Sequence, residues 1–84
     1  MWQSTVKKAL YEQSYAAFTS LLREERKKAG LTQAKLAKKI RRPQSYVSKY
    51  ERGDRRLDVV EFIEVAQVIG FDPHEFLQKL ISKS

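Results

Sequence analysis

The stretch GLTQAKLAKKIRRPQSYVSKYERG, residues 30–53, decides the fold. It begins and ends with glycine, and Pro43 divides it into two segments, each long enough for a short helix. Apolar residues recur in each segment at the spacing of one helical face: Leu36, Ala37 and Ile40, then Val47 and Tyr50. The stretch therefore predicts two short helices joined by a tight turn.

Residues with known preferences for helix ends mark the limits of these two helices. Gly30 suits the position just after an earlier helix, and Thr32 offers a side-chain oxygen to cap the next one. Pro43 suits the first turn of the second short helix, because its missing N–H has no intrahelical partner there. We predict this helix over about residues 43–52, with Gly53 ending it.

The flanking sequence adds three more helices. Before Gly30, an apolar face predicts a helix over about residues 15–29: Tyr15, Phe18, Leu22 and Ala29. After Gly53, residues 58–61 and 72–75 each have the Asp-x-x-Glu form of a capping box and predict two helix starts. The helix from Val59 to about Ile69 is apolar nearly all round, and the last one shows Phe76, Leu77, Leu80 and Ile81.

The elements together predict an all-α, five-helix domain over residues 15–82, with a helix-turn-helix at about residues 32–52. Residues 1–14 form an N-terminal extension. Val6, Leu10 and Tyr11 permit an added helix there, and a frayed arm is the alternative that the sequence leaves open. A chain of 84 residues suits one modest core.

The positive charge is concentrated in one segment. The chain carries a net charge of +7, yet residues 23–56 alone carry 13 basic and four acidic residues, and residues 57–84 are net negative. Such a segment indicates a polyanionic partner on one face, or else a solvated lysine-rich surface.

The sequence offers little for catalysis or metal binding. It has no cysteine, its one histidine is His74, and no glycine-rich phosphate loop is present. His74 falls in the first turn of a predicted helix, where a protonated imidazole is disfavoured. We therefore expect no enzyme, no catalytic residue, no metal and no cofactor.

The quoted stretch resembles a known family. The residues Gly30-Leu31-Thr32-Gln33, Leu36-Ala37 and Pro43 to Gly53, taken in register, are similar to the lambda-repressor/Cro-type (XRE) helix-turn-helix family. The resemblance extends from about Phe18 to Leu80 and leaves out the first dozen residues. It implies sequence-specific binding of double-stranded DNA by a prokaryotic or phage transcriptional regulator of the Cro/C1 type, such as a repressor.

The resemblance also implies a role for particular residues. The second short helix would enter the major groove, with base contacts from Gln44, Ser45 and Lys49, and with Tyr46 as a further candidate. Phosphate contacts would come from Gln33, Arg42, Arg52, Arg55 and Arg56. Arg26 and Glu51 match positions that form a structural ion pair in the family.

Two residues depart from the family pattern. Arg41 stands where the family usually has glycine, often in the left-handed conformation, which costs about 1–2 kcal/mol for a residue with a Cβ. Arg41 either tolerates this strain or the turn differs slightly. Pro43 replaces the more usual capping serine.

The last two predicted helices carry more apolar residues than one small core can bury, which predicts that copies of the chain associate. We expect a homodimer through the C-terminal helices; the alternative is that residues 1–14 fold back over the surplus within a monomer. A rival function is an antitoxin-type module that binds a toxin and regulates its own gene. A membrane-surface segment and RNA binding fit less well, because of the capping boxes and the few aromatics. We expect a cytoplasmic location and no membrane; the sequence leaves open whether a further protein partner binds.

Overall fold

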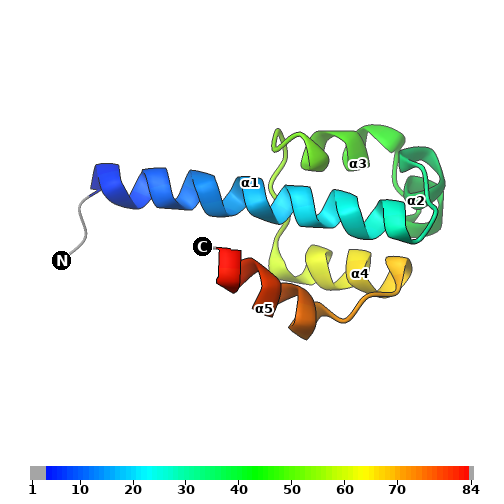
Figure 1. The fold of residues 1–84 in the computed structure, drawn as a ribbon. Helices are drawn as coiled ribbons and strands as arrows, with labels where there is room; N and C mark the ends of the chain where they lie inside the picture. The colour runs from blue at the N-terminus through cyan, green and yellow to red at the C-terminus, as the bar shows by residue number, and fades with distance from the viewer. Residues whose placement is uncertain (1–3, 84) are drawn as a thin grey trace.

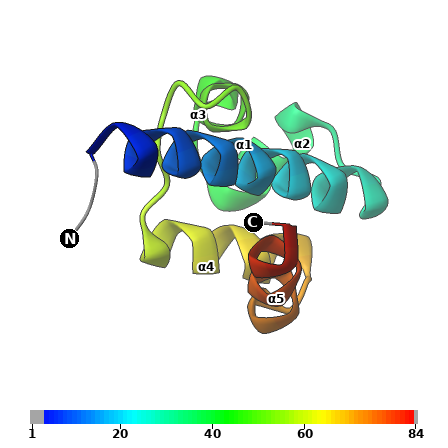
Figure 2. The same ribbon diagram turned by 60° about the vertical axis from the view of Figure 1, so that its left-hand side comes forward.

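The computed structural model describes residues 4–83, and their backbone forms five helices in the order that the sequence predicts. These are α1 (Ser4–Lys28), α2 (Gln33–Ile40), α3 (Gln44–Glu51), α4 (Val59–Ile69) and α5 (Pro73–Lys83). In both ribbon views α1 crosses the molecule between α3 on one side and α4 and α5 on the other (Figures 1 and 2). The described residues contain no strand, so the prediction of an all-α, five-helix fold is confirmed.

Helix α1 settles the question that the sequence leaves open about the extension. It runs without a break from Ser4 to Lys28, so residues 4–14 are the first half of the first helix rather than a frayed arm. Figure 1 shows this half projecting beyond the other helices. The helix ends before Gly30, whose φ of +74° is the left-handed conformation that glycine adopts at little cost.

The turn between α2 and α3 places Arg41 in the left-handed backbone conformation, one of the two alternatives that the sequence leaves open. Arg41 is the C-cap of α2 with φ 59° and ψ 45°, and it is the only non-glycine residue with positive φ among the described residues. Its backbone N–H is bonded to carbonyls of α2, which holds the conformation in place. Arg41 therefore carries the left-handed strain that a glycine would avoid.

The starts of α2 and α3 are capped differently. Thr32 is the N-cap of α2, and its hydroxyl accepts a hydrogen bond from the Lys35 N–H at 3.1 Å. The prediction that Pro43 lies inside the first turn of α3 is wrong: Pro43 is the N-cap, and the helix begins at Gln44. Proline has no side-chain acceptor, so α3 starts without a side-chain cap.

The start of α4 has the full predicted capping box. Asp58 accepts from the Glu61 N–H at 2.7 Å, and Glu61 accepts from the Asp58 N–H at 3.0 Å. At the start of α5, Asp72 instead accepts from the His74 N–H at 2.8 Å.

The core lies where α1 meets the other four helices. Leu22, Leu36 and Val47 are fully buried, so the predicted inner faces of α1, α2 and α3 meet. An aromatic cluster joins α1 to the C-terminal helices, with ring centroids 5.5 Å apart for Phe18 and Phe62 and 5.1 Å apart for Phe62 and Phe76. Side chains of α1, α2 and α3 thus share one core, and the aromatic cluster attaches the C-terminal helices to it.

The outer face of α4 stays uncovered. Phe62, Val65 and Ala66 are buried, whereas Val59 and Val60 are 73% and 75% exposed. The fold-back alternative is wrong for the described residues, because the first half of α1 continues as a helix and leaves these valines open. The surplus of apolar residues in α4 thus belongs to a second, solvent-facing side of the helix.

Candidate nucleic-acid interface

Helix α3 presents three of the predicted base-contacting residues on its exposed side. Gln44 and Ser45 lie in its first turn, Lys49 lies one turn after Ser45, and all three are exposed. The opposite side of the helix buries Val47 and Tyr50. The short row thus combines amide, hydroxyl and ammonium groups on a helix whose inner side is anchored in the core.

Tyr46 lies elsewhere than the sequence predicts. The residue is only 7% exposed, and two guanidinium groups lie over its ring, with Arg42 Cζ at 4.6 Å and Arg55 Cζ at 4.5 Å from the ring centroid. The ring is therefore on the inner flank of α3, away from the row of Gln44 and Ser45. Burial first, and then the charge of Glu61, raises the pKa of the Tyr46 hydroxyl.

Each arginine on Tyr46 is also held by a carboxylate of α4. Arg42 bonds Glu64 at 3.2 Å, and Arg55 bonds both oxygens of Glu61 at 3.2 and 2.9 Å. The hydrogen bonds from Arg55, and then that from the Asp58 N–H, hold the pKa of Glu61 below its usual range. Helix α4 thus fixes two of the predicted phosphate-contacting arginines beside α3.

The other two predicted arginines lie on the loop that follows α3. Arg52 forms an exposed ion pair with Asp54 at 3.0 Å. Arg56 lies over the ring of Tyr15, 4.1 Å from its centroid, and pairs with Glu12 at 3.7 Å. The loop is tied to α1 because the Tyr15 hydroxyl accepts a hydrogen bond from the Leu57 N–H at 3.0 Å.

Glu51, at the end of α3, is the centre of a buried polar network. The residue is 2% exposed, and Arg26 Nε donates to one of its oxygens at 2.6 Å while Arg26 Nη2 donates to the other at 3.1 Å. Gln33 Nε2 donates to that second oxygen at 2.9 Å. Arg23 adds a hydrogen bond of 3.0 Å to the Glu51 carbonyl. The network ties α1, α2 and α3 together.

This network also changes the position expected for Gln33. The side-chain amide, predicted to contact a phosphate, points to Glu51, while the residue itself opens helix α2. Its backbone N–H remains at a helix N-terminus, which is suited to an anion. In this structure the side-chain amide of Gln33 is therefore engaged by the carboxylate of Glu51.

Sequence reasoning missed the acidic residues of this surface. Glu12, Glu61 and Glu64 each hold an arginine, yet the sequence assigns only the capping role of Glu61. No spacing rule connects Glu64 to Arg42, because they meet only through the packing of α4 against α2. The three arginines within residues 52–56 are the sequence feature that could have predicted ion pairs with nearby carboxylates.

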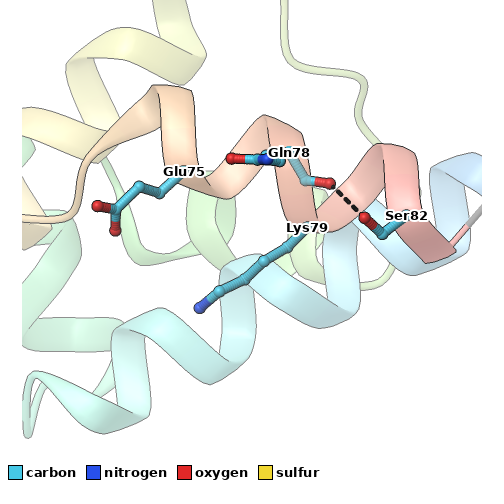
Figure 3. Close-up of a pocket in the computed structure, with 4 residues that line it drawn as sticks. All are labelled: Glu75, Gln78, Lys79 and Ser82. Atoms are coloured by element: carbon cyan, nitrogen blue, oxygen red, sulfur yellow. Dashed lines mark hydrogen bonds between the residues drawn. The ribbon is translucent and has the colours of Figure 1, made fainter.

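A surface hollow of about 610 Å³ is lined by Glu75, Gln78, Lys79 and Ser82, all on α5 (Figure 3). In that view Ser82 donates to the Gln78 carbonyl, a bond of 3.0 Å within the helix. Over residues 4–83, no cluster of three or more His, Cys, Asp or Glu side chains is placed to hold a metal ion.

Comparisons with known proteins agree with this geometry. The model of a helix-turn-helix family matches residues 22–76. A solved XRE-family like protein from Pseudomonas syringae pv. tomato str. DC3000 is 44% identical, with a TM-score of 0.89 over 94% of this chain and 96% of that one. The chain belongs to the XRE-type helix-turn-helix family.

More distant structures share the fold of this XRE-type chain. The wild-type restriction-modification controller protein C.Esp1396I is 23% identical, with a TM-score of 0.75 over 82% of this chain and 91% of that one. The tetramer of that controller in complex with its natural 35 base-pair operator gives 23% identity and a TM-score of 0.73 over the same shares. A search of curated proteins found no match. In the described part of the chain, no helix combines the length and apolarity needed to cross a membrane.

Proposed function

We propose that this XRE-type chain regulates transcription by binding double-stranded DNA in a sequence-specific manner. One observation carries the proposal: the exposed row of Gln44, Ser45 and Lys49 on α3, bordered by four arginines held in defined positions. An α-helix fits the major groove, where an amide can bond both N6 and N7 of adenine and an ammonium can reach the acceptors of guanine. The operator complex of the related controller, which shares the fold, supports the same class of ligand.

The two groups of residues have separate tasks in this proposal. Gln44, Ser45 and Lys49 contact base edges and set sequence preference. Arg42, Arg52, Arg55 and Arg56 contact phosphates and supply affinity that does not depend on sequence, together with the N-terminus of α2 at Gln33. Tyr46 is the platform on which Arg42 and Arg55 rest and is not itself a base contact.

Selection of binding sites from random duplex DNA is the test. The wild-type protein should enrich one near-palindromic site. Lys49→Ala should then relax the preference at particular base pairs by about 1–3 kcal/mol, while Lys79→Ala, which removes an exposed lysine of α5, should leave it unchanged. Enrichment of no sequence, or an unchanged preference in Lys49→Ala, would contradict the assignment.

We further propose that the DNA-binding form is a two-fold dimer. Large apolar side chains are exposed on both C-terminal helices: Val59, Val60 and Ile63 on α4, and Leu77 and Ile81 on α5. Pairing these faces would hide surface that a soluble monomer rarely leaves open and would keep the acidic C-terminal region away from phosphates. Two-fold symmetry would set two α3 helices about 34 Å apart, one turn of DNA. The antitoxin-type role stays a prediction, which a toxin gene beside this one would support.

A further inference from the structure

The residues proposed to contact phosphates share an unexpected feature: each holds an acidic partner within the chain. The pairs are Gln33 with Glu51, Arg42 with Glu64, Arg52 with Asp54, Arg55 with Glu61, and Arg56 with Glu12. Among these acids only Glu12 belongs to the extension, the first half of α1. It lies outside residues 22–76, the part matched by the family model.

Arg56 is held in place mainly by aromatic rings. Its guanidinium lies 4.1 Å from the centroid of Tyr15 and 5.2 Å from that of Tyr11, and the ring of Tyr15 is anchored to the loop through the Leu57 N–H. The carboxylate of Glu12 completes the set at 3.7 Å, a longer distance than a close charged hydrogen bond. The side chains of Arg56 and Glu12 remain 49% and 56% exposed, so a ligand can reach both.

A small hollow lies beside this pair. It has a volume of about 210 Å³, and its lining includes Glu12, Tyr15, Arg52, Gly53 and Arg56. Two arginines and one glutamate are therefore among the residues that line it. A phosphate entering the hollow would meet both arginines and would have to displace the carboxylate from Arg56.

Carboxylates and phosphates bind the planar guanidinium through the same N–H groups. An exposed ion pair is weak, so a DNA phosphate can replace Glu12 on Arg56. The displaced carboxylate then stays close to the phosphate and repels it. The cost falls on every DNA sequence alike, because the contact is to the backbone.

We propose that Glu12 competes with the DNA backbone for Arg56, and that the hollow beside them holds one backbone phosphate. The extension of α1 is thereby a built-in attenuator that lowers DNA affinity without changing base preference. This inference rests on the proposed function, and it assigns a role to a segment that lies outside the matched helix-turn-helix region.

The test is a cycle of variants measured on a fluorescent duplex of mixed sequence over a series of KCl concentrations. Glu12→Gln should bind about two- to fivefold more tightly than wild type near 0.1 M salt, with a gain that shrinks as salt rises. In an Arg56→Gln background the same change should give no gain. Glu24→Gln is the matched control: it removes the same charge from an exposed site on α1 roughly 18 Å further along the helix, beyond the screening length of about 10 Å.

Equal affinity of Glu12→Gln and wild type would overturn the inference, as would an equal gain with Arg56→Gln present. A second readout needs no DNA: inorganic phosphate is titrated while the side-chain Nε–H signal of Arg56 is followed by NMR. The signal should move at lower phosphate in Glu12→Gln than in wild type. If the signal moves at lower phosphate in Glu12→Gln but no variant binds the duplex, the competition between Glu12 and phosphate is supported and the proposed DNA-binding function is contradicted. If the two titrations are identical, the competition itself is contradicted.

Discussion

Removing Arg26 should destabilise the domain more than any surface substitution. Arg26 is 8% exposed and supplies two hydrogen bonds to the carboxylate of Glu51, which is itself 2% exposed. In Arg26→Met that carboxylate keeps the amide of Gln33 at 2.9 Å and a longer contact of 3.7 Å to Arg23. It is left as a buried charge with too few donors.

The magnitude follows from the cost of an uncompensated buried charge, about 3–5 kcal/mol. A domain of 84 residues has a total unfolding free energy of about 4–13 kcal/mol. Arg26→Met should therefore lose about a quarter or more of the stability. Glu51→Gln removes the charge and keeps the shape, so it should lose more than about 1 kcal/mol, because Arg26 is then the unpaired ion.

The double variant should lose much less than the two single losses added together, because neither charge remains. We expect a coupling energy of about 2 kcal/mol or more between the two sites. Urea unfolding followed by far-UV circular dichroism is the assay. With a slope of about 1 kcal/mol per molar urea, a loss of about 3 kcal/mol lowers the midpoint by about 3 M.

The exposed pair Arg52–Asp54 is the matched control. Its side chains are 58% and 59% exposed, so Arg52→Met and Asp54→Asn should couple by no more than about 1 kcal/mol. Additive losses for Arg26→Met and Glu51→Gln, or single losses no larger than those of the control pair, would refute the argument that burial makes this pair structural.

Three further substitutions test other parts of the fold. Arg41→Gly should relieve the left-handed strain and, after the entropy cost of glycine, raise stability by about 0.5–1 kcal/mol; a lower Tm would contradict the strained turn. Glu61→Gln should destabilise the fold most above pH 4.5, the ordinary pKa of this carboxyl, because ionised Glu61 is stabilised by Arg55. The difference in unfolding free energy between Glu61→Gln and wild type should shrink as the pH falls through the lowered pKa of Glu61. A difference that does not change with pH in urea unfolding would argue against a stabilising role for ionised Glu61. Val60→Glu or Ile81→Glu should convert the proposed dimer to monomer in sedimentation at micromolar protein with the circular dichroism spectrum unchanged, and a monomeric wild type on a palindromic duplex would rule the dimer out.

Local patterns predict the helices of this chain well. The N-cap at Thr32, the capping box of Asp58 and Glu61, and the end of α1 before Gly30 all depend on residues within four positions of one another. Such contacts form within one turn of helix, so the order of residue types is enough to predict them. The sequence places Pro43 in the first turn of α3, whereas it is the N-cap one position earlier; this error also concerns only neighbouring residues.

The candidate site was only partly predictable. The exposure of Gln44, Ser45 and Lys49 follows from the register of α3, since its apolar residues must face the core. The burial of Tyr46 does not follow, because its ring is covered in part by Arg55, which lies beyond the end of α3 and reaches the ring only after the loop has folded back.

The sequence by itself determined the presence and order of the five helices, the caps at Thr32 and Asp58, the position of the basic segment and membership of a helix-turn-helix type. Tertiary structure alone decided that α4 keeps Val60 exposed, that Glu61 and Glu64 hold arginines beside α3, and that Glu12 meets Arg56. The physical reason is the distance along the chain over which each interaction acts. Helix formation depends on neighbours one turn apart, whereas the Glu12–Arg56 ion pair joins residues that come together only after α1 has packed against the loop that follows α3.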